Sequence, residues 1–329
     1  MTMHYGTIDG VDKPVSRLVQ GTIPLSSGRE EESFRLLDEI FELGCRTFDT
    51  AHNYGRGDCE TVFGAWMRDR GVREEIVVLG KGAHPYDGRE RVTPEDITAD
   101  LHDSLARQQH EYFDMYLLHR DNPSLPVGPI VEVLNQHKRD GKISIFGGSN
   151  WSTSRIAEAN TYARENGLEP FAVSSPNFSL AVQIQPPWEG CISISGDVGK
   201  ADREWYRENN MPIVPWSSLA GGFFSGRFTR DNVDEMAANG DYFEKLCVAS
   251  YCSEENFQRL DRVREMAERD DMTIPQVAMA YVMSQPQEIF ALVGCRNGNE
   301  FAENAAMLDR RLTQEELDWL DLTSDNRPW

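Results

Sequence analysis

Residues 113–150, FDMYLLHRDNPSLPVGPIVEVLNQHKRDGKISIFGGSN, contain the pattern that decides the fold. A short apolar run at 113–120 precedes helical spacing over 130–140, and a second apolar run follows Gly141 at 143–150. Short runs that are apolar throughout are typical of strands buried on both faces, and glycine commonly follows the end of a helix. The segment therefore predicts a strand, a helix and a second, parallel strand.

The same alternation extends along the whole chain. Eight short β-rich runs are separated by segments with helical spacing, and eight such units close naturally into a barrel. We therefore predict an α/β protein with one (β/α)8 TIM-barrel domain over residues 1–329. The predicted strands lie at 16–22, 46–51, 76–82, 113–120, 143–150, 171–177, 212–218 and 290–297, and the predicted helices lie at 32–43, 58–70, 94–108, 130–140, 153–166 and 201–209.

Two longer segments interrupt this alternation after the sixth and seventh strands, at roughly 180–200 and 220–255. Loops of this length in a compact domain are usually functional, so we expect both segments to act as lids. Past the eighth strand, Thr313 and Glu316 have the spacing of a capping box and predict an extra C-terminal helix, TQEELDWLDL.

Composition limits the partners and the compartment. The 54 acidic residues outnumber the 33 basic ones, and the formal charge of -21 repels nucleic acid and anionic membrane surfaces. Six cysteines without a CxxC pair indicate reduced thiols, and the first residues, MTMHYGTIDG, lack the pattern of an export signal. No apolar run reaches 18 residues, the length typical of a spanning helix. We expect a cytoplasmic protein without nucleic-acid or membrane partners.

Ionisable side chains follow several predicted strands at their C-terminal ends, where barrel enzymes carry their reacting groups. Asp49 and Tyr54 follow the second strand, Lys81 ends the third, and His119 ends the fourth. We expect these four side chains to meet at one mouth of the barrel.

This set of residues suits proton delivery by a phenol. A tyrosine is a weak acid at neutral pH, and a nearby ammonium lowers its pKa by stabilising the phenolate. We therefore expect Lys81 to lower the pKa of Tyr54, Asp49 to hold Lys81, and His119 to hydrogen-bond a substrate carbonyl. The predicted chemistry is reduction of a C=O group.

The chain resembles the aldo-keto reductase superfamily over nearly its whole length. The family's Asp, Tyr, Lys and His appear in order in "FDTAHNYG" (Asp49, Tyr54), "LGKG" (Lys81) and "YLLHR" (His119). The resemblance implies that these four residues are catalytic and that the protein is an NAD(P)-dependent oxidoreductase. It also implies a small-molecule carbonyl or alcohol substrate and no metal.

The resemblance further implies where a dinucleotide binds. Ser149 and Asn150 of "GGSN" match the family's carboxamide contacts, and Trp216 of "VPWSSL" matches the aromatic position that stacks on the nicotinamide. The stretch "GCRNGNEFAEN" is similar to the family's G-x-R-x-x-x-Q-x-x-x-N adenosine pattern. The full set of expected cofactor residues is Thr22, Ser149, Asn150, Ser175, Trp216, Ser217, Leu219, Gly221, Gly294, Arg296, Glu300 and Asn304.

Two of these positions depart from the family pattern. Ser175 stands where the family usually has Gln, so one carboxamide contact is expected to be shortened or mediated by water. Glu300 stands where Gln or a basic residue is usual, and a carboxylate repels a 2′-phosphate but accepts hydrogen bonds from a free 2′-hydroxyl. Arg296 favours NADP(H) and Glu300 favours NAD(H); we expect NADP(H) by a narrow margin.

The expected substrate contacts are His84, Arg120, Trp151 and Trp188. Aromatic faces with polar tips suit a polyhydroxylated carbonyl, so a sugar or keto-sugar is one expected substrate. Two other functions stay open. One is a cofactor-binding regulatory subunit with slow turnover, and the other is a metal-dependent barrel isomerase or hydrolase that uses His52, His84, His119 and Asp121. The sequence leaves the oligomeric state open.

Overall fold

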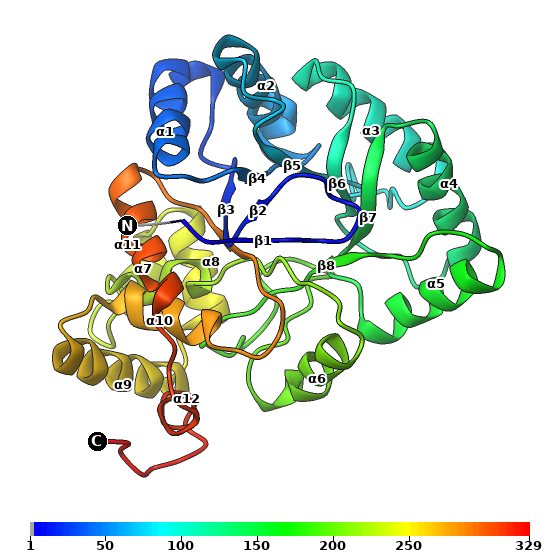
Figure 1. The fold of residues 1–329 in the computed structure, drawn as a ribbon. Helices are drawn as coiled ribbons and strands as arrows, with labels where there is room; N and C mark the ends of the chain where they lie inside the picture. The colour runs from blue at the N-terminus through cyan, green and yellow to red at the C-terminus, as the bar shows by residue number, and fades with distance from the viewer. Residues whose placement is uncertain (1–2) are drawn as a thin grey trace.

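The computed structural model describes residues 3–329 and contains a curled, all-parallel sheet of seven strands. Their spatial order is β8-β7-β6-β5-β4-β3-β9, so strands that neighbour in sequence also neighbour in space, and β9 returns to β3. Figure 1 shows the strands at the centre with α1 to α5 around them. The strands are β3 (Leu18–Gly21), β4 (Thr47–Asp49), β5 (Val77–Gly82), β6 (Phe113–Leu118), β7 (Ile143–Ser149), β8 (Val173–Ser175) and β9 (Ala291–Val293).

The predicted seventh strand, 212–218, is not a regular strand. Pro212 and Pro215 have no N–H to donate, and the segment forms isolated bridges, from Ile213 to Ser174 on one side and Ile289 on the other, and from Trp216 to Asn177. The Val214 N–H donates to Ser174 O at 2.8 Å, and the Phe290 N–H donates to Ile213 O at 2.9 Å. This segment fills the gap between β8 and β9, and the (β/α)8 barrel is confirmed.

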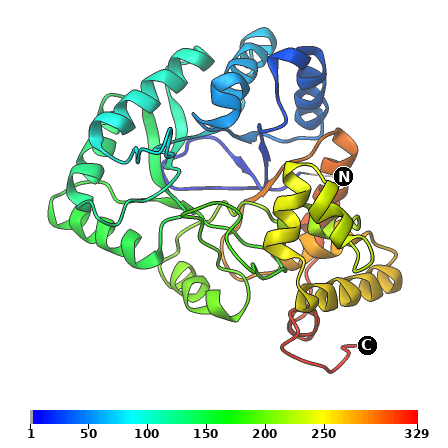
Figure 2. The same ribbon diagram turned by 180° about the vertical axis from the view of Figure 1, so that it is seen from behind.

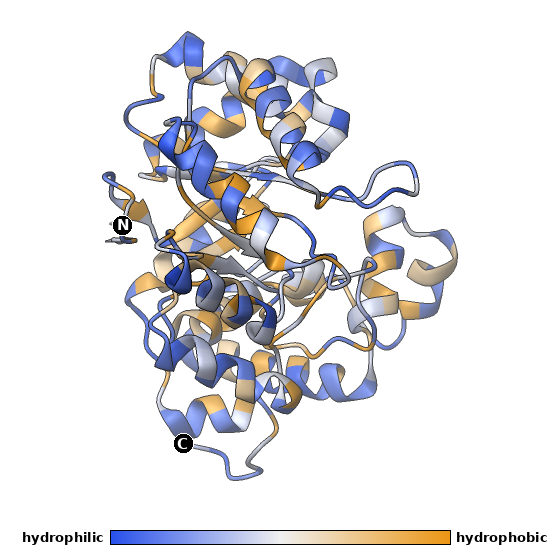
Figure 3. Ribbon diagram, turned by 90° about the vertical axis from the view of Figure 1, so that its right-hand side faces the viewer, coloured by the Kyte–Doolittle hydropathy of each residue, from blue (hydrophilic) through white to orange (hydrophobic). Residues whose placement is uncertain are grey.

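The helices follow the prediction closely. The ends of α2 and α3 coincide with the predicted ones, whereas α4 begins earlier than residue 130 because Pro129 is tolerated in a first helical turn. Figure 3 shows hydrophobic residues gathered on the strands and hydrophilic ones on outward helix faces. The helices around the barrel are α1 (Glu30–Glu42), α2 (Asp58–Arg70), α3 (Pro94–Gln108), α4 (Val127–Arg139), α5 (Thr153–Glu165), α6 (Lys200–Glu208), α9 (Glu254–Asp270) and α10 (Ile274–Met283).

An N-terminal hairpin that the sequence reasoning missed closes one end of the barrel. Its strands, β1 (Tyr5–Gly6) and β2 (Val15–Ser16), are antiparallel, and the dark-blue segment crosses the ring in Figure 1. Its turn places Ile8 and Val11 in a cluster with side chains from the barrel interior. The cluster contains Ile8, Val11, Val15, Val19, Val77, Leu79, Met115, Leu117, Ile145, Val173, Val214 and Phe290. The opposite mouth is left for chemistry.

The two long segments differ from each other. Segment 180–200 is irregular apart from η3 (Asp197–Gly199) and the first residue of α6, as expected for a loop. Segment 220–255 is not a loop: it contains η4 (Ala220–Ser225), α7 (Val233–Asn239) and α8 (Tyr242–Tyr251), and Asp241 and Glu244 form a capping box that starts α8. These helices are yellow in Figure 2, which shows the molecule from behind.

The chain ends with α11 (Gly298–Ala305), η5 (Ala306–Asp309) and α12 (Gln314–Leu320). Thr313 and Glu316 form the predicted capping box of α12, so the extra C-terminal helix is confirmed. Between residues 3 and 329, none of the helices combines the length and apolar character needed to cross a membrane.

Candidate active site

Four side chains from three neighbouring strand ends converge at the barrel mouth. Asp49 ends β4, Lys81 lies near the end of β5, and His119 directly follows β6. The Lys81 ammonium donates a hydrogen bond to Asp49 Oδ1 and lies 5.1 Å from the centre of the Tyr54 ring. The Tyr54 ring meets the His119 ring edge-on, with centroids 5.7 Å apart. The structure thus brings together all four residues expected to be catalytic.

Burial shapes the charges of three of these groups. Asp49, Lys81 and His119 are 1%, 3% and 8% exposed. Burial lowers the pKa of Lys81 and raises the pKa of Asp49, and each partner's charge opposes the shift of the other. Burial, with the charges of Lys81 and Arg120, lowers the pKa of His119 well below its ordinary value. His119 is therefore a neutral imidazole that can hydrogen-bond a carbonyl substrate.

Tyr54 differs from the sequence-based expectation. We expected the Lys81 ammonium to lower its pKa, but burial and the negative charge of Asp49 raise the pKa of Tyr54 well above the ordinary value. The charge of Arg120 opposes this shift without reversing it. Because Asp49 offsets the charge of Lys81, desolvation decides the sign. The phenol is consequently protonated at neutral pH, as a proton donor must be.

Two expected substrate contacts have structural duties instead. Arg120 is buried, and its guanidinium donates to Glu189 O at 3.0 Å, His119 O at 2.8 Å and Cys191 Sγ at 3.3 Å. It anchors segment 180–200 to the barrel. Trp151 is 1% exposed, and its indole donates to Arg120 O at 3.1 Å, so this residue lies in the core.

The other two expected substrate contacts lie at the mouth. The His84 ring is 5.0 Å from the His119 ring, and burial lowers the pKa of His84. Trp188 is 37% exposed, lies 6.1 Å from Trp216, and donates its indole N–H to the Tyr242 hydroxyl at 2.8 Å. Sequence reasoning missed Tyr242 because it lies in a segment that we expected to be a loop without helices.

The expected nicotinamide contacts form one group beside His119. Asn150 has a left-handed backbone, with φ of 59°, and donates to Ser149 Oγ at 3.1 Å and to His119 O at 3.3 Å. Its carbonyl oxygen accepts the Trp216 indole N–H at 3.2 Å. Ser175 instead donates its hydroxyl to Val214 O at 2.7 Å, inside the barrel wall.

Unsatisfied polar atoms test whether these residues fit a dinucleotide. Among residues 3–329, Thr22 Oγ1, His119 Nδ1 and Asn304 Oδ1 are buried without a hydrogen-bond partner. Buried polar atoms normally have partners, so a polar ligand at this face is expected to supply some of them.

The expected phosphate-binding turn also fits a dinucleotide. Ser217 and Gly221, at φ of 55° and 61°, belong to the turn after the seventh barrel segment, which also contains Leu219. The position that a Cβ would take at Gly294 is open space, with no other atom within 4 Å, so this side of the backbone is accessible to a ligand. The residues present fit the expected cofactor.

Glu300 has a local structural duty at the expected adenosine site. Its carboxylate accepts the Arg296 backbone N–H at 2.8 Å and the Asn297 side-chain N–H at 3.3 Å, and the Glu300 N–H donates back to Asn297 Oδ1 at 2.9 Å. These contacts cap the start of α11, and the Asn-x-x-Glu spacing at 297–300 is the sequence signal for them. The Arg296 side chain is exposed.

The residues considered for a metal centre do not form one. Asp121 is engaged by Arg155, with Nε 3.1 Å from Oδ2. Within the described part of the chain, no three His, Cys, Asp or Glu side chains are arranged to hold a metal ion. The donor set therefore gives no support to a metal-dependent isomerase or hydrolase.

Comparison with known proteins assigns the chain to a family. The model of the aldo/keto reductase family matches residues 17–324. A probable aryl-alcohol dehydrogenase of Saccharomyces cerevisiae is 23% identical over 312 residues, covering 90% of this chain and 89% of the relative. A probable voltage-gated potassium channel subunit beta of Oryza sativa is 25% identical over 310 residues, covering 91% and 89%.

The fold comparison agrees with this assignment. A thermostable aldo-keto reductase, crystallised with the inhibitor epalrestat, superposes with a TM-score of 0.72 at 20% identity, covering 98% of this chain and all of that one. The chain belongs to the aldo/keto reductase family and is an NAD(P)-dependent oxidoreductase.

Proposed function

We propose that this protein reduces an aldehyde or ketone to an alcohol, or catalyses the reverse oxidation, with Tyr54 as the proton donor. The observation that carries the proposal is the packing of the Tyr54 ring between the Lys81 ammonium, 5.1 Å away, and the His119 ring, 5.7 Å away. When bound, the reduced nicotinamide supplies the hydride that the carbonyl carbon receives.

Each residue has a distinct task in this reaction. Neutral His119 hydrogen-bonds the substrate carbonyl and fixes its orientation, and Tyr54 gives its proton to the carbonyl oxygen. The Lys81 ammonium stabilises the phenolate that remains until solvent returns the proton. Asp49 accepts the hydrogen bond that holds Lys81 in place. Ser149, Asn150 and Trp216 would hold the nicotinamide beside this group.

NADP(H) is the proposed cofactor. The Arg296 side chain is exposed and, among residues 3–329, makes no ion pair, so it is free to meet a 2′-phosphate. The Glu300 carboxylate is already accepting two hydrogen bonds at the start of α11. A ribose 2′-hydroxyl would have to compete with these contacts, which supports NADP(H) over NAD(H).

The mouth favours a flat aromatic carbonyl over a keto-sugar. Arg120, which we expected to meet sugar hydroxyls, spends its donors on Glu189, His119 and Cys191. Aromatic rings extend from Trp216 through Trp188 to Tyr242 and Phe243, and Tyr86 adds an exposed ring after β5. The name of the yeast aryl-alcohol dehydrogenase is in line with this class of substrate.

A regulatory subunit that binds cofactor but turns over slowly is the second candidate, favoured by the name of the rice relative. One experiment separates the two functions. The purified protein is mixed with NADPH and, in parallel, with aromatic aldehydes, aliphatic ketones and keto-sugars, while nicotinamide absorbance reports turnover. We expect turnover, fastest with aromatic aldehydes. Tight NADPH binding without turnover of any carbonyl would favour the regulatory subunit.

A further inference from the structure

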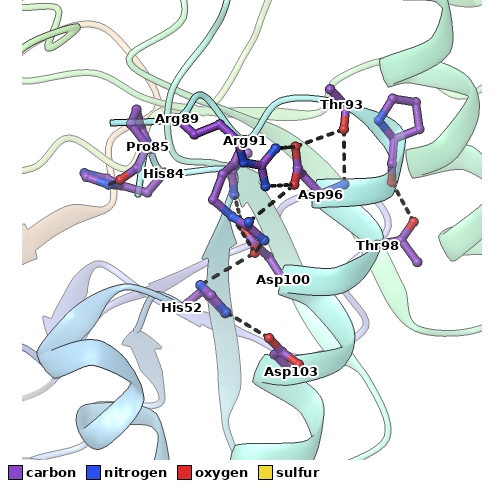
Figure 4. A network of polar contacts seen from close by, with 12 residues as sticks. His52, His84, Pro85, Arg89, Arg91, Thr93, Asp96, Thr98, Asp100 and Asp103 are labelled. Carbon is purple, nitrogen blue, oxygen red and sulfur yellow. Dashed lines mark hydrogen bonds and ion pairs between the residues drawn. The ribbon is translucent and has the colours of Figure 1, made fainter. Parts of the chain in front are cut away.

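The carboxylate of Asp100, on α3, lies between two segments of the site: the loop after β4, which carries His52 and Tyr54, and the turn after β5, which carries Ala83 and His84 (Figure 4). Asp100 is fully buried. Its Oδ2 accepts the Ala83 N–H at 2.8 Å, and its Oδ1 accepts the Arg91 Nε at 3.0 Å and a second Arg91 N–H. His52 Nδ1 lies 3.7 Å from the same oxygen. One carboxylate therefore contacts both loops.

The first contact holds an unfavourable backbone conformation. Ala83 is buried and has φ of 60°, in the left-handed region that costs a non-glycine residue about 1 kcal/mol. Ala83 lies between Lys81 on β5 and His84, whose ring packs 5.0 Å from the His119 ring. The hydrogen bond from Ala83 to Asp100 thus fixes the turn that presents His84 to the site.

The close approach of α3 to this turn depends on Gly82. A Cβ at Gly82 would clash with the Tyr116 hydroxyl on β6 and would lie 2.9 Å from the Cβ of Asp100, closer than real Cβ contacts come. The absence of a side chain lets the helix bring Asp100 within hydrogen-bond reach of the turn. The contact is therefore part of the packing between α3 and β5.

The second contact reaches the loop of Tyr54. His52 lies between Asp49 and Tyr54, and its N–H donates to Lys81 O at 2.8 Å. The opposite ring nitrogen of His52 lies 3.3 Å from Asp103, one helical turn beyond Asp100. Arg107 on the same helix donates to the His52 carbonyl at 2.8 Å. α3 thereby grips the loop that carries Tyr54 through His52.

A neighbouring aspartate offers a comparison inside the same network. Asp96, one turn before Asp100, is also buried and pairs with Arg89 at 2.6 Å and Arg91 at 3.3 Å. It accepts the Thr93 hydroxyl at 3.0 Å and caps the start of α3 with it. No hydrogen bond or ion pair of Asp96 reaches the described residues of the Tyr54 or Lys81 segments. Of these two aspartates, only Asp100 contacts the segments that carry Tyr54 and Lys81.

We propose that Asp100 is a positioning residue for carbonyl reduction, which holds His84 over His119 through Ala83 and holds the Tyr54 loop through His52. Its carboxylate touches no reacting group and acts through the geometry of the two loops. The inference rests on the proposed function, because it assigns a residue that supports the same site.

Asp100→Asn tests this role, with Asp96→Asn as the matched control. The amide keeps the size of the side chain but has only one acceptor oxygen, so it cannot accept the hydrogen bonds of Ala83 and Arg91 on two separate oxygens. We expect kcat for an aldehyde to fall about 10- to 100-fold, the scale of misplaced catalytic groups, while NADPH affinity changes less than twofold. Asp96→Asn should lower thermal stability comparably and leave kcat within twofold.

A double-variant cycle tests whether Asp100 acts through His84. If it does, Asp100→Asn combined with His84→Ala should lose less kcat than the product of the two single losses, because the two changes disrupt the same position of His84; the part of the loss that passes through His52 should remain. If the kcat loss of the double variant equals the product of the two single losses, Asp100 does not act through His84. Equal kcat losses in Asp100→Asn and Asp96→Asn would overturn the proposal as a whole, since the loss would then follow general stability.

His52→Ala keeps the test decisive if Asp100→Asn does not fold. The His52 side chain is 19% exposed, so its removal is less disruptive than a change at Asp100. We expect kcat to fall about 3- to 10-fold with NADPH affinity unchanged. An unchanged kcat would overturn the second contact. Failure of the proposed function would show separately, as activity that survives Tyr54→Phe.

Discussion

Lys81 donates a hydrogen bond to Asp49 inside the barrel mouth, where both side chains are almost completely buried. A buried ion pair gains little over an apolar pair, but breaking it leaves an uncompensated charge. The pair is therefore best understood as a device that keeps an ammonium next to the Tyr54 ring.

Lys81→Met should remove both stability and activity. Loss of the cation leaves Asp49 buried and unpaired, which we expect to lower the free energy of unfolding by about 3 kcal/mol. Reduction should fall about 100-fold or more, because the phenolate loses its stabilising charge. Chemical denaturation and steady-state kinetics measure the two effects.

The double variant Lys81→Met, Asp49→Asn separates these effects. It no longer buries a charge, so it should regain stability without regaining activity. Recovery of both together would show that the pair serves only the fold.

Tyr54→Phe should reduce kcat by about 100-fold or more and leave NADPH affinity nearly unchanged, because it removes only the proton donor. Tyr116→Phe is the matched control: the Tyr116 hydroxyl is buried, has no hydrogen-bond partner and belongs to β6. The control should keep full activity. An active Tyr54→Phe enzyme would contradict the assigned role.

Much of the fold and of the catalytic group followed from sequence. Parallel strands buried on both faces can be recognised in the sequence as short apolar runs. Polar residues at the C-terminal ends of such strands lie at the same mouth of the barrel. The segment 212–218 was harder, because Pro212 and Pro215 keep the barrel position but remove the ladder. The helices within 220–255 were missed because glycines and aromatic residues obscure their periodicity.

What depended on burial could not be predicted. The sign of the pKa shift at Tyr54 follows from desolvation, which only the packed structure reveals. Trp151 and Arg120 follow strand ends in sequence, yet both side chains are buried, and the Trp151 indole donates a hydrogen bond to the Arg120 carbonyl. The role of Asp100 was equally hidden, since an aspartate within a helix has no distinguishing pattern.

The buried histidines should lower stability as the pH drops below about 6.5. Burial lowers the pKa of His110 to about 3 and the pKa of His119 well below its ordinary value, so the unfolded chain binds these protons first. Each such group makes unfolding easier by up to about 1.4 kcal/mol per pH unit between its folded and unfolded pKa. His110 is partly exposed, so its contribution to the change in the free energy of unfolding is smaller than this upper value.

His110→Gln should flatten this pH dependence. The variant removes one of the buried histidines that titrate, and denaturation curves between pH 4 and 7 should therefore lie closer together than those of the parent. Arg68→Gln, an exposed position whose side chain donates to Gln108 O near His110, serves as the control. If the free energy of unfolding of His110→Gln depends on pH as steeply as that of the parent, His110 must have the same pKa in the folded and the unfolded chain.

Arg296→Ala should weaken NADPH binding about tenfold and leave NADH binding within twofold. The guanidinium is exposed, unpaired within the described chain, and suited to a 2′-phosphate that NADH lacks. Glu300→Gln is the informative partner variant, because the amide can still accept the Arg296 N–H through its oxygen while the negative charge is lost. It should strengthen NADPH binding modestly. Fluorescence titrations of both variants with both cofactors measure the four affinities, and equal losses for NADPH and NADH in Arg296→Ala would place this arginine away from the 2′ position.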